Sequence, residues 1–407
     1  MLSKSINILR EYSAFLLLGT AVALLWANLD FQGYHDFAEH AIFSSEFLSH
    51  SAGTPLEINF HFVINDIFMV LFFGIAMKEV SESFLPGGAL SSLNKAAMPA
   101  IATLGGVLGP IGLFFILLKT LGVPAGIEGF GKAWAIPTAT DIAYCWLFAG
   151  LILGRKHPGV TFLLVLAVLD DLIGMGIIAV FYTDKVHPEW LLLVLLAIII
   201  VETMRRLRIK SFWPYIIIGA PLAWLGLHKT GVHSALALVP IIPFMPHAVR
   251  DSGMFQTSAD GHHSHDTMNS FEHYFKPIVD LGLFGFGLAN AGVVLGVESF
   301  TGSPTWIILL SLLVGKTVGI YLFSVIGSLL GLKLPEGMKM KHQLVIGMLA
   351  GIGFTVALFV TSVVVKTNPA WPKSVGDMLK LGALLSFSAG PIAYVLAKII
   401  KVKRIDE

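Results

Sequence analysis

The chain has 407 residues, of which 55% are hydrophobic and 13% charged, and its formal net charge is +1. Charged residues make up about 25% of an ordinary soluble domain, so this composition indicates an integral membrane protein. The near-neutral charge leaves no basic stripe for nucleic acid, and the single cysteine, Cys145, excludes an intrachain disulfide.

Apolar runs bounded by charged residues, Pro and Gly predict an all-α protein with about twelve transmembrane helices in one domain over residues 1–407. Met1 to Arg10 is too short and polar for a cleaved signal peptide, so Tyr12 to Asn28 is expected to stay as the first span. Later spans start near Asn59, Lys95, Phe130, Val160, Trp190, Phe212, Val232, Pro277, Thr305, Leu344 and Lys380.

Lys and Arg predict the orientation of these spans. Alternate loops on the side of the N-terminus hold 19 basic residues, Lys78 among them, against 6 on the opposite side, while Lys316 and Lys380 lie within spans. Basic residues concentrate in cytoplasmic loops, so both termini are expected in the cytoplasm. The polar cytoplasmic loop over residues 246–275 contains His262, His263 and His265, a tract that either binds metal or titrates, or is a plain flexible linker.

Two adjacent acids, Asp170 and Asp171, lie in the middle of the apolar run Val160 to Phe181. One ionisable group at the centre of a bilayer costs about 2.5–3.5 kcal/mol on insertion scales, so such a pair predicts a functional site in a watered cavity. A hard cation such as sodium and a proton would compete for the same carboxylate oxygens. The alternative is a structural pair satisfied by neighbouring hydroxyls.

A second signal follows Trp134 in the span that starts at Phe130. Pro137 lacks the N–H that an unbroken helix needs, so the helix is expected to open and free the hydroxyls of Thr138 and Thr140 beside Asp141. A simple proline kink is the alternative.

Gly351 and Gly353 predict a second interruption, in the middle of Leu344 to Val365. Paired interruptions in two halves of a transporter indicate a substrate site at the midplane. Lys316, near the middle of its own span, must pair with an acid or lose its proton, and Asp141, Asp170 or Asp171 could serve as the acid. It would either neutralise helix ends or form a salt bridge with an aspartate when no cation is bound.

At these residues the chain resembles the NhaA family of sodium/proton antiporters of bacterial inner membranes. The matching stretches occur in the family's order over nearly the whole chain: YHDF, VIND, WAIPTATDIA, LAVLDDLIGMGIIAVFYT, GVHSALAL, ANAGV, GKTVGI and GIGFTVALF.

The resemblance implies twelve helices with two inverted repeats, here at about 95–185 and 304–401, and two crossed discontinuous helices at the midplane. It implies that sodium, with lithium as a second substrate, and protons bind at Asp170 and Asp171 near Thr140, while Asp141 and Lys316 balance helix ends. His233, in GVHSALAL, matches a histidine linked to pH response, and Asp66 lies in VIND. No cofactor is implied, and the Leu29 to Ile58 segment resembles a region of homodimer contact.

The chain also departs from the family. Where members read Gly-Leu-Glu-Val-Lys-Arg-Glu, this chain has Ala76 and Val80 in place of both glutamates. Glu79, Glu82, Glu272 and His273 could form a rearranged pH-sensing cluster. Asp280 has no counterpart in the family pattern and would either line the cytoplasmic entrance or lie at headgroup level.

The predicted function is export of sodium in exchange for protons, electrogenic and pH-regulated, by a secondary transporter and not an enzyme. One rival is a different reaction on the same scaffold, such as sodium-coupled symport or potassium exchange. A second is an intramembrane aspartyl protease, which needs two facing aspartates on separate helices, and a third is a sensor derived from an antiporter.

Overall fold

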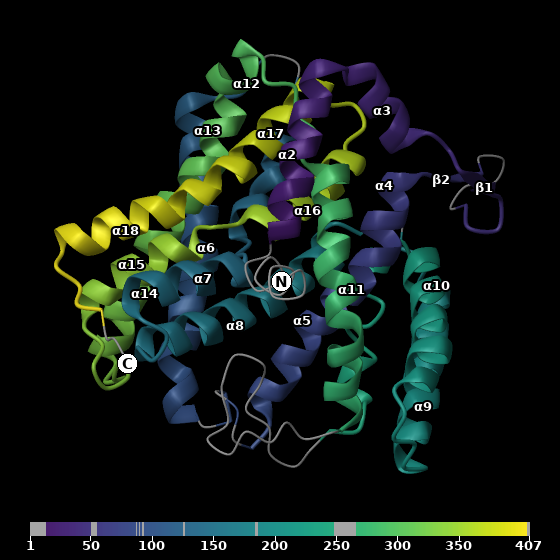
Figure 1. The fold of residues 1–407 in the computed structure, drawn as a ribbon, viewed down its shortest axis with the longest axis horizontal. Helices are drawn as coiled ribbons and strands as arrows, with labels where there is room; N and C mark the ends of the chain where they lie inside the picture. Colours follow the sequence, from purple (N-terminus) through teal and green to yellow (C-terminus); the bar gives the residue numbers. More distant parts are fainter. Residues whose placement is uncertain are drawn as a thin grey trace, which may run out of the picture. The chain divides into compact units, whose positions relative to one another are not determined.

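The computed structural model describes residues 14–49, 55–86, 88, 90–91, 93–124, 127–183, 186–247 and 266–404. Most of these residues are helical, and the sheet they contain is one short two-stranded hairpin (Figure 1). The histidine tract at His262, His263 and His265 lies outside the described residues.

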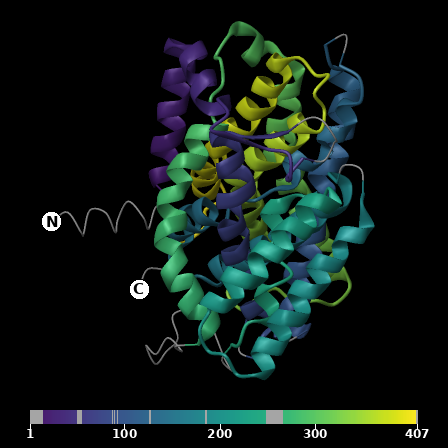
Figure 2. The ribbon, with the colours of Figure 1, turned by 90° about the vertical axis from the view of Figure 1, so that its right-hand side faces the viewer.

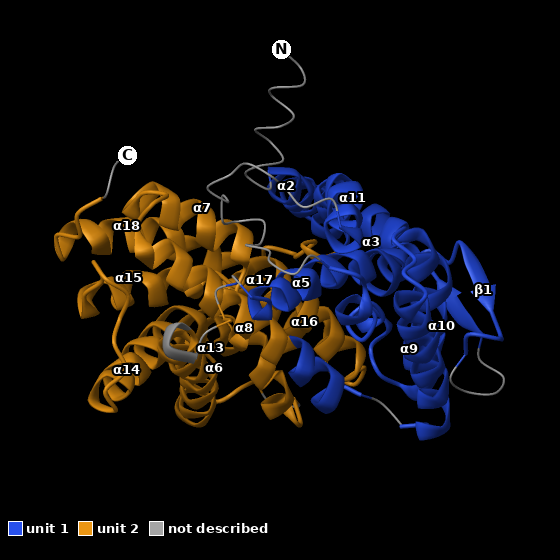
Figure 3. Ribbon diagram, turned by 90° about the horizontal axis from the view of Figure 1, so that it is seen from below, with its two compact units in different colours: residues 1–88, 175–289 blue, residues 89–174, 290–407 orange. Residues whose placement is uncertain are grey.

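The chain divides into two compact units, each made from two separate stretches of sequence (Figure 3). Unit 1 contains residues 1–88 and 175–289, and unit 2 contains residues 89–174 and 290–407. Unit 2 therefore contains most of residues 95–185 and 304–401, the two stretches that the family resemblance predicts to be repeats.

Unit 1 is built from helices and the hairpin. Its elements are α2 (Ala14–Leu29), α3 (Phe31–Glu39), β1 (Phe43–Ser45), β2 (Leu56–Ile58), α4 (Phe60–Phe62), the π-helical η1 (Val63–Phe68), α5 (Met69–Phe84), η3 (Pro188–Trp190), α9 (Leu191–Arg206), η4 (Tyr215–Gly219), α10 (Ala220–Thr230), η5 (Ser234–Leu236), η6 (Ile242–Phe244) and α11 (Thr267–Asn290). Helices α9 and α10 lie side by side (Figure 2). The strands β1 and β2 are antiparallel, with Ser44 opposite Glu57.

Unit 2 holds the interrupted helices. Its elements are α6 (Leu93–Leu121), the 3-10 helix η2 (Phe130–Thr138), α7 (Ile142–Leu153), α8 (Pro158–Phe181, whose last turns belong to unit 1), α12 (Val297–Thr301), α13 (Ser303–Leu310), the π-helical η7 (Ser311–Gly315), α14 (Lys316–Leu329), α15 (Met340–Ala350), α16 (Phe354–Lys366), α17 (Lys373–Leu385), η8 (Ser386–Ser388) and α18 (Ala389–Ile399).

Helices long and apolar enough to cross a membrane are fewer than the twelve expected. The described residues contain five, or up to seven if each of two bent pairs counts as one span. The five are Phe60–Phe84, Ala96–Leu121, Pro158–Phe181, Ser303–Leu329 and Lys373–Ile399. The stretch expected to span from Val232 to Met245 forms short 3-10 turns instead of one helix, because two prolines, Pro240 and Pro243, interrupt its backbone hydrogen bonding.

Lys78 also differs from its expected position. The distribution of basic residues predicts a cytoplasmic loop position for Lys78, but this residue lies within α5 and is only 1% exposed. Three carboxylates that surround it compensate for its burial, as described below.

Candidate functional site

The first interruption separates η2 from α7. Pro137 lies in the last turn of η2, and Ala139 is extended, with φ −73° and ψ 148°. Helix α7 then begins at Ile142, so the two helical pieces are bent by 45°. The break frees carbonyl groups at the end of η2 and N–H groups at the start of α7 for contacts with other segments.

The second interruption separates α15 from α16 at Gly351, Ile352 and Gly353, with a bend of 48°. The two breaks hydrogen-bond to each other. Asp141 N donates to Ile352 O over 2.6 Å, and Thr140 Oγ1 donates to Ala350 O over 3.0 Å. Groups that each helix leaves unpaired are therefore satisfied by the other break.

Asp141 caps two helices with one carboxylate. Its Oδ1 accepts from Tyr144 N at the start of α7, over 3.3 Å. Its Oδ2 accepts from the backbone N of Thr355 at the start of α16, over 3.1 Å, and from the Thr355 hydroxyl. Helix N-termini carry partial positive charge, so a single carboxylate between two of them is well placed.

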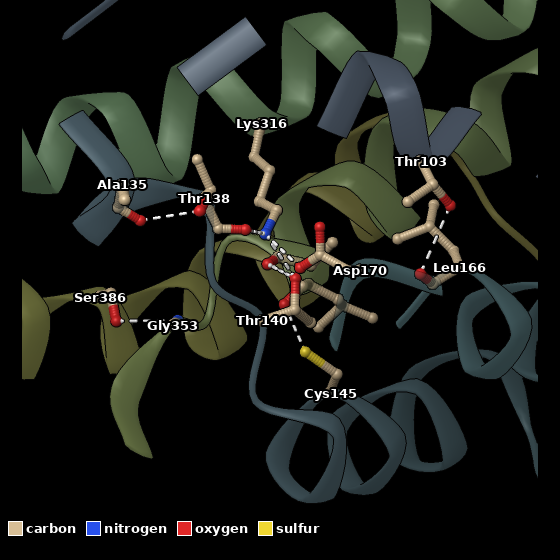
Figure 4. A network of polar contacts seen from close by, with 12 residues as sticks. Thr103, Ala135, Thr138, Thr140, Cys145, Leu166, Asp170, Lys316, Gly353 and Ser386 are labelled. Carbon is tan, nitrogen blue, oxygen red and sulfur yellow. Dashed lines mark hydrogen bonds and ion pairs between the residues drawn. The ribbon is translucent and has the colours of Figure 1, made fainter. Parts of the chain in front are cut away.

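Lys316, the first residue of α14, is completely enclosed. Its ammonium donates to Thr138 O at the end of η2, to Thr140 Oγ1 over 2.6 Å, and to Asp170 Oδ2 over 2.8 Å (Figure 4). Of the three acids that the sequence left open as partners, the structure therefore pairs Asp170 with the lysine. The contact with Thr138 O also places a positive charge at the negative end of η2.

The two midplane acids of α8 differ in their surroundings. Asp170 is 3% exposed, and its Oδ1 has no hydrogen-bond partner among the described residues. Asp171, the next residue of α8, is half-buried. A buried carboxylate oxygen without a partner is costly, so Asp170 Oδ1 has the property expected of a ligand atom.

Close packing of α6 on α14 sets the position of Lys316. A Cβ on Gly105 would lie 2.2 Å from Gly319 O, and one on Gly315 would lie 2.7 Å from Pro110 Cα. The helix backbones touch because these residues have no side chain, which is how small residues act between membrane helices. Lys316 directly follows Gly315, so the site depends on this contact.

Unit 1 contains a separate buried charge cluster centred on Lys78. The Lys78 ammonium lies 2.5 Å from Glu272, 2.6 Å from Glu82 and 3.8 Å from Glu79. The predicted acids Glu79, Glu82 and Glu272 therefore come together, while His273 is exposed. We call Lys78, Glu79, Glu82 and Glu272 the Lys78 cluster.

Three other predicted residues lie in unit 1, outside that cluster. Asp66 is buried in η1, where its Oδ1 accepts from Ser234 Oγ over 2.8 Å. His233 accepts from Ala235 N through Nδ1 over 3.3 Å. Asp280 lies within α11 and pairs with Lys276 over 3.1 Å.

Two residues with central contacts had no role in the sequence analysis. Thr355 lies in the stretch GIGFTVALF without a predicted role, and Lys78 is predicted only as a loop residue. The signal for Lys78 was its spacing from Glu82, because an i,i+4 pair lies on one helix face. Nothing local signals that Thr355 would meet Asp141, 214 positions earlier.

The site has no grouping typical of a tightly held metal. Within the part of the chain that the structure describes, no three His, Cys, Asp or Glu side chains gather closely enough to hold one. Carboxylate, hydroxyl and carbonyl oxygens line the site instead, which are the ligands that hard cations prefer.

Apolar spanning helices, two mutually bonded helix breaks and buried charges beside them define a membrane transporter of the discontinuous-helix class. Comparison with known sequences gives the family. The family model described as Na+/H+ antiporter 1 matches residues 5–396, and the chain belongs to this family. The resemblance noted in the sequence is thereby confirmed.

Related proteins match this chain from end to end. "Na(+)/H(+) antiporter NhaA" of Geobacter sulfurreducens is 47% identical over 406 residues, which cover 99% of both chains. "Na(+)/H(+) antiporter NhaA 2" of Pelobacter propionicus is 44% identical over 407 residues, covering 99% of this chain and 100% of the relative. The NhaA of Desulfitobacterium hafniense is 43% identical over 408 residues, covering 99% of this chain and 98% of the relative.

Proposed function

We propose that this protein exports sodium in exchange for protons across the bacterial inner membrane, with Asp170 and Asp171 as the shared binding groups. The observation that carries the proposal is the enclosed ion pair of Lys316 with Asp170, which leaves Asp170 Oδ1 without a partner beside two helix breaks. The names of the related antiporters support the same reaction.

Coupling follows from competition for the same oxygens. A sodium ion needs several oxygen ligands, and Asp170, Asp171 and Thr140 offer them on adjoining segments. When sodium binds, it replaces the Lys316 ammonium as the positive charge next to Asp170. When sodium leaves, protons or the ammonium must neutralise the carboxylates, because an unpaired charge in a membrane interior is too costly to persist.

The exchange is electrogenic if the two aspartates together take up two protons for each sodium released. Each net charge moved is then worth about 2.3 kcal/mol per 100 mV of membrane potential. Lithium is a second substrate, since the same hard oxygen ligands suit a smaller monovalent cation.

Access to the site alternates between the two sides of the membrane. The proposal includes inverted repeats at about 95–185 and 304–401, crossed interrupted helices, cytoplasmic termini and a homodimer contact near Leu29 to Ile58. The similar bends at the two helix breaks, and the hydrogen bonds between the breaks, support the inverted repeats and the crossed interrupted helices. Inverted repeats around a midplane site allow one bundle to rock against another.

Regulation by pH is assigned to the Lys78 cluster. Three carboxylates surround one ammonium in a buried setting. The family glutamates replaced by Ala76 and Val80 are compensated by Glu79 and Glu82 on the same helix.

Transport by vesicles that contain the purified protein tests the main proposal. Vesicles with an acidic interior and a pH-sensitive dye should recover fluorescence when sodium is added outside. Asp170→Asn and Asp171→Asn should abolish the recovery, whereas Glu298→Gln, which removes the charge of an exposed carboxylate of α12, should not. No recovery with the unmodified protein, or full recovery with Asp171→Asn, would overturn the proposal.

A different cation-coupled reaction is the second candidate. The observation in its favour is the altered family motif in α5, where Ala76 and Val80 take the place of two glutamates. A panel of sodium, lithium and potassium, with and without organic solutes, separates the two candidates. Recovery that requires an organic solute indicates symport, and recovery with potassium alone indicates a potassium exchanger.

A further inference from the structure

Two buried histidines of unit 2, 185 residues apart, lie against each other. The rings of His157 and His342 have their centroids 5.0 Å apart and are nearly perpendicular, at 87°. The two residues are 2% and 5% exposed. We call them the histidine pair.

Each histidine accepts a hydrogen bond from the backbone at the start of a helix. His157 directly precedes α8, and its Nδ1 accepts from Gly159 N over 2.9 Å. His342 lies in the first turn of α15, and its Nδ1 accepts from Lys339 N over 2.9 Å. Both rings therefore satisfy N–H groups that a helix start leaves without an internal partner.

These contacts require that both rings are neutral. An Nδ1 that accepts from a backbone N–H must keep its lone pair, so the ring proton is on Nε2. A protonated ring carries hydrogen on both nitrogens, and its Nδ1–H would point at another N–H. Protonation would also bring a positive charge to the positive end of a helix.

The surroundings of the pair oppose protonation further. Burial lowers the pKa of His157, which lies in the loop before α8. The positive charges of Lys339 and Lys341 disfavour a positive charge on His342, as a protonated His157 would. Arg155, in the loop with His157, stacks on Trp146 of α7, and the Lys341 ammonium binds Lys401 O beyond α18 over 2.6 Å. The side of α14 towards α15 presents the neutral Thr317 and Ser328.

Both capped helices reach the candidate site. Helix α8 bears Asp170 and Asp171, and α15 ends at Ala350, whose carbonyl accepts a hydrogen bond from the Thr140 hydroxyl. The histidine pair joins the starts of both helices at the ends away from the site. A change at this junction is therefore transmitted to the site along two helices.

We propose that His157 and His342 are positioning residues that hold α8 and α15 together only while both are neutral, so that acidification on the side they face loosens the cation site. Arg155, Lys156, Lys339 and Lys341 place this side in the cytoplasm by the distribution of basic residues. The histidine pair is distinct from the Lys78 cluster. It lies in unit 2, whereas the cluster lies in unit 1, and acid adds positive charge to the pair by protonating its rings.

The sign of the pH effect follows from the lowered pKa of His157. Above the unfolded value of about 6.5, the ring is neutral in both states and the cap contributes its full stability. As the pH falls below that value, the unfolded chain takes up a proton that the folded chain resists. The folded state therefore loses stability towards acid.

The decisive variant is the double substitution His157→Asn and His342→Asn. The amide oxygen of Asn can take the place of Nδ1 as an acceptor and does not titrate. The unmodified protein should lose thermal stability between about pH 7.5 and about pH 5, and the double variant should lose clearly less. His187→Asn, a change at an exposed histidine before α9, should behave as the unmodified protein does.

Exchange by vesicles gives a second readout, which rests on the proposed function. The ratio of the double variant's sodium-dependent rate to that of the unmodified protein should rise at least about 3-fold from pH 8 to pH 5.5. The ratio isolates the histidine pair, since the Lys78 cluster is unchanged in both proteins. If no exchange occurs with either protein, the proposed function fails, and the melting comparison still decides the role of the pair.

Equal pH dependence of melting in the double variant and the unmodified protein would overturn the inference, as would a constant rate ratio in proteins that do exchange. If the double variant does not fold, His157→Asn and His342→Asn are measured singly. Each should then remove part of the acid loss of stability, and no reduction in either would also overturn the inference.

Discussion

The ammonium of Lys316 lies 2.8 Å from Asp170 Oδ2 in a fully enclosed part of unit 2. Removing one member of a buried ion pair leaves the other charge without compensation, which costs about 3–5 kcal/mol. We expect Lys316→Met to lower the free energy of unfolding by that amount, measured by detergent titration in mixed micelles. Lys316→Met combined with Asp170→Asn should lose less than Lys316→Met alone. A double variant as unstable as the sum of the two single variants would contradict this pairing.

The double cap made by Asp141 leads to a second prediction. Thr355→Val removes a hydroxyl that donates to this carboxylate, and hydrogen bonds to charged groups contribute about 1.5–3 kcal/mol. Thr361→Val is a matched control in the same helix, because the Thr361 hydroxyl only donates to Ala357 O one turn earlier. We expect a larger loss of unfolding free energy for Thr355→Val, and equal losses would show that the contact with Asp141 contributes little.

The contact of α6 with α14 can be tested with two glycines of α6. A Cβ on Gly105 would lie 2.2 Å from Gly319 O, whereas one on Gly112 would meet nothing within 4 Å. Gly105→Ala should therefore lower the free energy of unfolding by about 1–3 kcal/mol and displace Lys316, with a loss of exchange. Gly112→Ala should be neutral or slightly stabilising. Similar stability of the two variants would mean that the helices separate without cost.

The Lys78 cluster predicts a stability loss that depends on pH. Lys78→Met leaves Glu79, Glu82 and Glu272 without their central cation, and repulsion among the acids grows as they ionise. The variant should be more strongly destabilised at about pH 8.5 than at about pH 5.5, because protonation of the acids relieves the repulsion. Lys78→Arg retains the charge and should show a smaller difference. The measurement is the melting temperature across this range, and a loss independent of pH would argue against the cluster.

Much of the fold class was accessible from local sequence. Apolar runs of membrane length, Pro137, the Gly351 and Gly353 pair and charges inside spans each act on their own segment, so their effect on a helix can be predicted without knowing what packs against it. The ordered motifs identified the family for the same reason. The prediction was weaker at Val232 to Met245, where the apolar run is long enough for a helix and Pro240 and Pro243 prevent one.

The sequence by itself determined that this chain is a helical membrane protein of the sodium/proton antiporter family with acids in the middle of α8. Only the tertiary structure decided that Lys316 pairs with Asp170, that Asp141 caps both α7 and α16, and that Lys78 is buried among three glutamates. Local patterns encode helices and membrane burial, whereas each of these partnerships depends on how segments far apart in the chain pack. Several acids could balance a buried lysine, and the distances between helices select one.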